Sequence, residues 1–262
     1  MNDKFFYFTV DDNIRFLHEL TKYEKNSLFS HPYTALLRRM HEKYGVKIQL
    51  NLFYECEGFN LSEMTDKFAR EWAECADWLK LSFHSRLENV RPYEHCDYSE
   101  VLADLREVHR EILRFAGEGS LAKTTTVHYC LLTEGGIKAL YESGIRGLLG
   151  LYGDAKAPRL SYQSSESDAK KLREGEAITE DGIIYRNIDL ILNKIPLSDT
   201  EKKINALDGR ERISVMIHEQ YFYPDYAAYQ PDFEEKLDKA FATLLKNGYS
   251  PSFFEDETVK IQ

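Results

Sequence analysis

The sequence predicts an α/β protein in which parallel strands are covered by helices and approach a closed barrel. Strand-like segments, rich in aromatic and β-branched residues, alternate with amphipathic helical segments along all 262 residues. About seven strand–helix units are expected, which is near the size of a (β/α) barrel, and helices supply the crossovers that parallel strands need. An open doubly wound sheet is the alternative. The G-x-G-x-x-G pattern of dinucleotide-binding sheets does not follow the first strand, which disfavours that function.

The first half of the chain is expected to alternate between strand and helix. Aromatic or alternating apolar residues predict strands over residues 4–10, 46–54 and 79–84. Helical spacing of apolar residues predicts helices over residues 31–44, 61–78 and 98–117. Gly45 and Gly117 are the expected ends of the first and third helices, and Ser62 and Ser99 are the expected N-caps of the second and third. The second helix is expected to bury one face, made of Met64, Phe68, Trp72 and Cys75.

The same alternation continues through the second half. Strands are expected over residues 123–129, 145–152, 182–195 and 212–223, and helices over residues 134–144, 199–209 and 232–248. The polar segment 155–182 interrupts the pattern and predicts an insertion or hairpin. Either this segment shapes or covers a pocket, or it is an idle surface excursion. We find no repeat or linker, so residues 1–262 are expected to form a single domain.

Composition excludes several classes of protein. Acidic residues exceed basic ones by 44 to 34, so a partner with a phosphate backbone, such as nucleic acid, is disfavoured. No apolar run is long enough to span a membrane, and the N-terminus lacks the apolar core of a signal peptide, so a cytoplasmic protein is expected. The cysteines form no C-x-x-C pair and are expected to be reduced packing residues: Cys56, Cys75, Cys96 and Cys130.

Several polar groups are expected at the ends of strands. Asp11 and Asp12 follow the first strand, and His84, His128 and His218 lie at or near the ends of three later ones. The carboxyl ends of parallel strands meet at one face, where the chemistry of such folds is located. Two adjacent carboxylates repel each other unless a cation or a shared proton relieves the charge, and zinc accepts both imidazole and carboxylate ligands. The sequence therefore predicts a polar site that holds a metal at this face.

The stretch "FTVDDN" resembles the T-F-D-D motif that opens the polysaccharide deacetylases, carbohydrate esterases that remove N- or O-acetyl groups from chitin, peptidoglycan or xylan. The resemblance implies the irregular (β/α)₇ barrel of that family, with Asp11 as catalytic base and Asp12 as metal ligand. The stretch "HSRLE" resembles the family motif H-[ST]-x-x-H, with His84 and Ser85 matching and Glu88 replacing the second histidine. The i, i+4 spacing would place His84 and Glu88 on one face of a helical turn.

The later motifs match less completely. "MIH" resembles the family's L-x-H and implies that His218, with an ordinary pKa, is the acid that protonates the leaving group. The family's R-x-P-Y is reduced to "TVHYC", in which only Tyr129 remains, and His128 lies close enough to supply the ligand that the motif lost at Glu88. The D-x-x-D-W motif, whose aspartate orients the base, has only Asp189 as a candidate equivalent.

The resemblance implies a metal-dependent hydrolase that removes an acetyl or related acyl group from a carbohydrate or another small amide. The cofactor would be a divalent metal, with zinc favoured and cobalt, nickel or manganese as alternatives, held by Asp12, His84 and either Glu88 or His128. A serine esterase is disfavoured because no G-x-S-x-G motif is present. The alternative is a barrel of this family that has lost the chemistry and binds a carbohydrate or small ligand.

Overall fold

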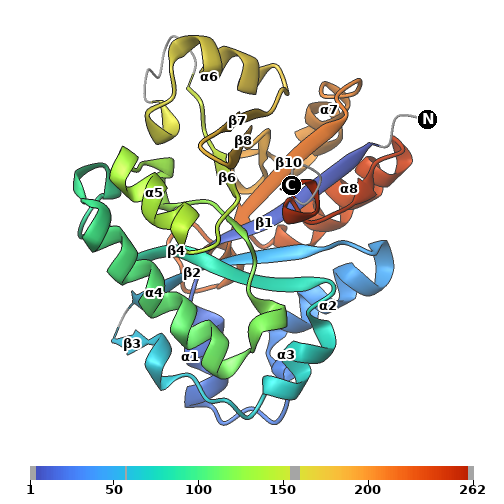
Figure 1. Cartoon of the computed structure of the whole chain (residues 1–262). Coiled ribbons are helices and arrows are strands. Elements are labelled where there is room, and N and C mark those ends of the chain that lie inside the picture. The colour runs from blue at the N-terminus through green and yellow to red at the C-terminus, as the bar shows by residue number, and fades with distance from the viewer. Residues whose placement is uncertain (1–3, 57, 154–159, 259–262) are drawn as a thin grey trace.

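The computed structural model describes residues 4–56, 58–153 and 160–258 (Figure 1). Its strands form two sheets. The larger sheet has the order β3-β2-β1-β10-β9, with β4 added beside β2 and β11 beside β1. Its members are β1 (Phe5–Asn13), β2 (Ile48–Cys56), β3 (Phe59–Asn60), β4 (Leu79–Leu87), β9 (Leu190–Ile191), β10 (Arg212–His218) and β11 (Ser250–Pro251). The smaller sheet has the order β5-β6-β8-β7, made of β5 (Thr124–Thr125), β6 (Gly147–Gly150), β7 (Ile178–Glu180) and β8 (Ile183–Asn187).

The two sheets join at two seams and complete an irregular parallel barrel. The first strand pairs in parallel with both β2 and β10, so it lies between an early and a late strand. At the first seam, a parallel bridge between Leu81 and Leu121 connects β4 to the chain just before β5. At the second seam the chain passes from β8 into β9, where the amide of Asp189 donates to the carbonyl of Ser214 at 2.9 Å. The barrel of the deacetylase type is therefore confirmed, and the open doubly wound sheet is not observed.

Helices lie outside the strands (Figure 1). They are α1 (Arg15–Lys22), α2 (Pro32–Tyr44), α3 (Ala69–Cys75), α4 (Tyr98–Phe115), α5 (Glu134–Glu142), α6 (Glu166–Arg173), α7 (Thr200–Asn205), α8 (Phe233–Lys246) and α9 (Glu255–Thr258). The α2 helix ends as expected, because Gly45 adopts the left-handed φ of 65° that a helix C-terminus often requires. In the described part of the chain, no helix combines the length and the apolar character needed to cross a membrane.

The N-caps of two expected helices are different residues from those predicted. The carboxylate of Asp97, not the hydroxyl of Ser99, caps α4 by accepting from the amide of Glu100 at 2.9 Å. Ser99 already lies inside the first turn, and its hydroxyl donates to Asp97. Likewise Asn60, rather than Ser62, caps the 3-10 turn that replaces the start of the second predicted helix.

The prediction of a continuous helix over residues 61–78 is wrong. The 3-10 turn Leu61–Glu63 is followed by Met64 in an extended backbone conformation, and α-helix begins only at Ala69. The predicted apolar face is nevertheless buried at all four positions: Met64, Phe68, Trp72 and Cys75. Burying a large apolar side chain stabilises the fold by about 1.5–3 kcal/mol. The four side chains can reach the core although the helix is interrupted, because the chain before Ala69 still runs along the same side of the barrel.

Four expected strands are shorter or divided. The strand expected at 145–152 is reduced to β6. The strand expected at 123–129 is reduced to β5, and the carbonyl of Thr126 accepts a hydrogen bond from the ring of His84. The strand expected at 182–195 divides into β8 and β9, which belong to different sheets. The strand expected at 212–223 ends at His218, where the 3-10 turn Glu219–Phe222 begins. The division between β8 and β9 occurs where the two sheets meet. After β5, the backbone carbonyl of Thr126 accepts from a side chain instead of a neighbouring strand.

The polar insertion contains regular structure. Its described part, residues 160–182, holds a 3-10 turn, α6 and β7, which pairs in antiparallel fashion with β8 as a hairpin. Residues 155–159 of the predicted insertion lie outside the described residues. The cysteines form no disulfides, as expected: Cys75, Cys96 and Cys130 are buried, and Cys56 is half-buried.

Candidate metal centre

A bulge at the end of β1 brings two adjacent carboxylates to the same mouth of the barrel. Successive side chains of a regular strand point to opposite faces. Here Asp12 has a left-handed φ of 60°, and the pairing of β1 with β2 shifts register between Val10 and Asn13. The side-chain amide of Asn13 closes the bulge by donating to the carbonyl oxygen of Val10 at 2.6 Å. Such conformations are costly for residues other than glycine and concentrate at functional sites.

Three side chains place one ligand atom each around a common point. Oδ1 of Asp12 lies 3.0 Å from Nε2 of His84 and 3.3 Å from Nδ1 of His128. The two histidine nitrogens are themselves 3.0 Å apart. Ligands at about 2.1 Å in a tetrahedral zinc site are separated by roughly 3.4 Å, so this triangle is close to one face of such a site. The structure therefore brings together Asp12, His84 and His128 as a candidate metal cluster.

Neighbouring groups orient these ligand atoms. The ring of His84 donates from Nδ1 to the carbonyl of Thr126 at 2.5 Å, which leaves the lone pair of Nε2 directed at the cluster. Gln220 donates from Nε2 to Oδ2 of Asp12 at 2.6 Å and so holds the second oxygen of that carboxylate. The ring of Phe53 packs edge-on against both histidines, with centroids 5.2 and 5.0 Å away. These contacts restrict the rotation of all three candidate ligands.

The donor set fits a divalent cation. Burial opposes ionisation of Asp12, yet the neighbouring imidazoles of His128 and His84 hold the pKa of that carboxyl well below its usual range. A carboxylate oxygen and the lone pair of His84 Nε2 at 3.0 Å repel each other unless a proton or a cation lies between them. Two imidazoles and one carboxylate form a borderline set that accepts zinc, cobalt or nickel, and manganese less readily.

Asp11 lies beside this cluster and is buried. Burial raises the pKa of the Asp11 carboxyl, against the opposing effect of His84 and His218. Oδ1 of Asp11 accepts from Nδ2 of Asn51 at 2.6 Å, and Oδ2 has no hydrogen-bond partner among the described residues. Asn51 is held in turn by the amide of Gln49, which donates to Asn51 Oδ1 at 2.8 Å. Asp11 is thus a fixed carboxylate with one oxygen available for a proton.

His218 lies opposite Asp11 on the neighbouring strand, as their register pairing shows. Its Nε2 is 4.0 Å from Oδ2 of Asp12, so the late histidine and the first acids share one end of the barrel. Nδ1 of His218 lies 2.9 Å from Oδ1 of Asn193. The expectation of an ordinary pKa is wrong, because burial lowers the pKa of His218 despite the raising effect of Asp12 and Asp11.

Two other expected site residues lie outside the cluster. Glu88 does not share a helical turn with His84, because β4 continues as strand to Leu87. Glu88 is exposed and lines a cavity of about 110 Å³ next to Asp12. Asp189 forms an ion pair with Arg210, 2.5 Å from its Nη1, and accepts from the amide of Ser214. Ser214 pairs with Tyr7, four residues before Asp11 on β1, so the position of Asp189 does not allow it to orient Asp11.

Sequence reasoning missed the residues that support the site. Four such residues appear in no short motif: Asn51 and Phe53 on β2, Asn193 in the 3-10 turn Leu192–Lys194, and Gln220 in the turn Glu219–Phe222. A signal for one of them was available: Gln49 and Asn51, like Lys47 before them, are polar at alternate positions of the predicted strand 46–54. Polar residues on the buried face of a strand require partners, which points to the barrel interior.

Neither a protein-family model nor a curated protein sequence matches the chain. Solved structures do match. A 4-α-glucanotransferase from Thermococcus litoralis superposes with a TM-score of 0.62 at 15% identity, over 98% of this chain and 40% of that one. A family 4 acetyl xylan esterase from Clostridium thermocellum, in complex with a cobalt ion, gives a TM-score of 0.54 at 14% identity, over 98% and 91% of the two chains. A peptidoglycan N-acetylglucosamine deacetylase gives 0.51 at 12% identity, over 97% and 88%.

These likenesses establish the fold. The chain spans two fifths of the glucanotransferase but most of the length of the esterase and the deacetylase. It therefore has the fold of the family 4 polysaccharide deacetylases, although its sequence is only 14% and 12% identical to the two solved structures.

Proposed function

On this deacetylase fold, we propose that the chain is a metal-dependent hydrolase that removes an acetyl or related acyl group from a carbohydrate or another small amide or ester. The observation that carries the proposal is the placement of Asp11 and His218 beside the cluster of Asp12, His84 and His128 at one mouth of the barrel. This arrangement combines candidate metal ligands, a candidate base and a candidate acid within reach of one bound acyl group.

Asp12, His84 and His128 would hold the metal, with zinc favoured by the donor set. When bound there, a divalent cation polarises an acyl carbonyl and lowers the pKa of a water molecule. Asp11 would accept the proton of the attacking water at Oδ2, the oxygen that Asn51 leaves free. Because burial raises the pKa of Asp11, its carboxylate is a stronger base than that of an exposed aspartate.

His218 would protonate the departing nitrogen or oxygen. Its Nδ1 is directed at the amide oxygen of Asn193, which leaves Nε2 as the atom that carries the transferred proton. The strand register places His218 beside Asp11, so base and acid approach the reacting group from adjacent strands. Such general acid and base groups usually contribute about 10²–10⁴-fold each.

A barrel that binds a small ligand without turnover is the second candidate, and one observation favours it. The pKa of His218 is lowered by burial, so at neutral pH only a minor fraction of this residue holds the proton that an acid must donate. The cavity next to Asp12, at about 110 Å³, also admits only a small group.

Acetate release separates the two candidates. Purified protein loaded with zinc or cobalt would be tested on N-acetylated sugars, their oligosaccharides and activated acetate esters across a range of pH. We expect turnover that Asp11→Asn lowers by about 100-fold or more while the metal content stays the same. Asp66→Asn, an exposed aspartate without an ion-pair partner among the described residues, is the matched control and should keep the wild-type rate. Full metal loading with no turnover of any substrate would favour the binding protein.

A further inference from the structure

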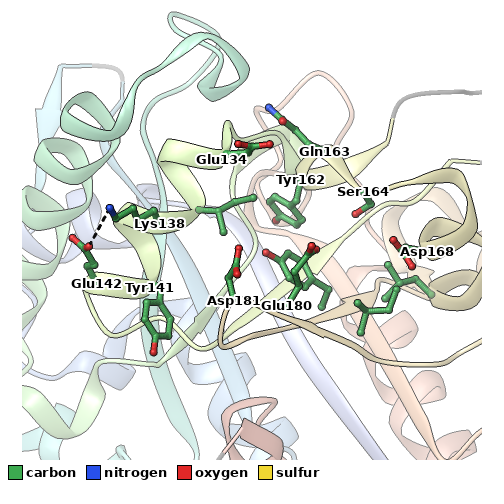
Figure 2. A pocket seen from close by; sticks show the side chains of 14 residues that line it. Glu134, Lys138, Tyr141, Glu142, Tyr162, Gln163, Ser164, Asp168, Glu180 and Asp181 are labelled. Carbon is green, nitrogen blue, oxygen red and sulfur yellow. Dashed lines mark ion pairs between the residues drawn. The ribbon is translucent and has the colours of Figure 1, made fainter.

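A second and larger pocket lies apart from the metal centre. It has a volume of about 580 Å³ and is formed by α5, the 3-10 turn Ser161–Gln163, α6 and the β7–β8 hairpin (Figure 2). It shares no lining residue with the cavity next to Asp12. The described part of the polar insertion therefore contributes to this pocket rather than to the metal centre.

Acidic side chains dominate the polar lining of this pocket. Figure 2 shows them on both sides of the opening: Glu134, Glu142, Asp168, Glu180 and Asp181. Lys138 is the single basic residue of the lining, and its Nζ lies 3.9 Å from the carboxylate of Glu142. In the described ranges no lysine or arginine lies within ion-pair distance of Glu134, Glu180 or Asp181. These three carboxylates consequently bring to the pocket negative charge that no lysine or arginine of the described residues pairs with.

Apolar and aromatic groups form the buried part of the lining. Tyr162, Leu172 and Tyr185 are buried, and the two tyrosine rings lie 6.1 Å apart. Tyr162 is fully engaged, because its hydroxyl donates to the carbonyl of Leu149 and accepts from the amide of Val127.

Tyr185 is different, because its hydroxyl has no hydrogen-bond partner among the described residues although only 5% of the residue is exposed. The hydroxyl oxygen itself is not fully enclosed, so it is the part of this residue that reaches the pocket. Its ring lies close enough to Glu180 and Asp181 for both to raise the pKa of the phenol, after burial itself. Tyr185 thus remains neutral and offers an unused oxygen acceptor on the wall of an acidic pocket.

We propose that this pocket binds a small organic ammonium ion, namely a protonated amine with an aliphatic or sugar body. The carboxylates of Glu134, Glu180 and Asp181 attract the ammonium group, and the phenol oxygen of Tyr185 accepts one of its N–H bonds. Tyrosine faces also attract cations, and the apolar lining covers the hydrocarbon part of the ligand. The volume is within the range of small-molecule sites. This site is independent of the hydrolase activity proposed above.

Isothermal titration calorimetry on the whole chain tests the proposal. Spermidine represents aliphatic amines and glucosamine represents amino sugars, while N-acetylglucosamine is the neutral counterpart of the second probe. We expect saturable one-to-one binding of at least one amine, and N-acetylglucosamine should not displace that amine. Magnesium chloride at equal ionic strength should compete weakly, because an inorganic ion gains nothing from the aromatic lining. If magnesium displaced the bound amine as effectively as a second amine does, the carboxylates would attract cations without selecting the organic part of the ligand. That result would overturn the proposal.

Substitutions in the lining test whether the amine binds in this pocket. Glu180→Gln combined with Asp181→Asn should weaken the amine at least tenfold, and both positions are exposed, so the fold should tolerate the change. Asp181 has a left-handed φ of 49°, which asparagine accepts readily. Tyr185→Phe should weaken binding severalfold with no change of charge. Asp66→Asn combined with Asp77→Asn removes two exposed charges elsewhere and should leave affinity within twofold. Equal affinity in the wild type and the Glu180/Asp181 variant would refute the site.

Discussion

The side-chain amide of Asn51 donates a 2.6 Å hydrogen bond to Oδ1 of Asp11 inside the barrel, where both residues are buried. Asn51 is one part of a polar chain through the barrel interior. Gln49 donates to Asn51 and to the carbonyl of Thr124, and the hydroxyl of Thr124 donates back to Gln49. The chain links β1, β2 and β5 and holds the candidate base in one orientation.

Removing this hydrogen bond should change the pH dependence of the reaction. A hydrogen bond to an ionised carboxylate favours the charged form, so Asn51→Ala should raise the pKa of Asp11 further. The acidic limb of kcat/KM would then move to higher pH, while the metal content remains that of the wild type. Stability should fall by about 1–3 kcal/mol, because Gln49 and Asp11 each lose a buried partner. An acidic limb at the wild-type position would show that Asn51 does not act through Asp11.

The third metal ligand can be identified by a matched pair of variants. His128→Ala removes a ligand atom 3.0 Å from that of His84 and should weaken zinc binding by about 100-fold or more. Glu88→Gln removes an exposed carboxylate outside the cluster and should change zinc affinity by less than threefold. Competition with a chromophoric chelator measures both. A large loss of zinc affinity in Glu88→Gln with little change in His128→Ala would instead identify Glu88 as the third ligand.

The lowered pKa of His218 predicts an early loss of activity with rising pH. An acid must be protonated to donate, so the basic limb of the profile should begin below the ordinary histidine pKa of about 6.5. Asn193→Asp gives His218 an anionic partner at the same position, which favours the imidazolium and should move the basic limb to higher pH. A basic limb that stays in place would assign it to another group.

Glu219 should make the stability of the fold depend on pH. Its buried carboxylate accepts from the amides of Ile14, Arg15 and Phe16 at the start of α1, and burial raises its pKa to about 7. In the unfolded chain the value is 4.5. The folded state therefore retains a proton that the unfolded chain has already lost, so stability from this group falls as pH rises from about 4.5 to about 7.

The loss is at most about 3–4 kcal/mol, since one pKa unit corresponds to about 1.36 kcal/mol. Urea unfolding at several pH values measures it. Glu219→Gln is less stable overall because it loses acceptor capacity, but it should lack this decline. The same decline in the variant would assign it to other groups.

Patterns of residues close together in the sequence determined the order of helices and strands and several residues of the candidate site. The alternation of strand and helix, the end of α2 at Gly45 and the buried face of residues 64–75 depend on side chains a few positions apart, and periodicity records them directly. The acids after β1 and the histidines at later strand ends were recognisable because parallel strands bring their carboxyl ends together. From these features alone, Asp11, Asp12, His84, His128 and His218 were expected at one face, where the structure has them.

Tertiary structure decided what depends on contacts between distant segments. The left-handed turn at Asp12 exists because the pairing of β1 with β2 shifts there, and no local pattern signals it. The choice of His128 over Glu88 in the cluster depends on how β4 and the chain after β5 meet, 44 residues apart in sequence. Asn51 and Gln220 reach the two acids from residues 40 and 208 positions away. Hydrogen bonds of such separation follow from closure of the barrel, which is why the sequence alone located the site and only the folded chain defined its geometry.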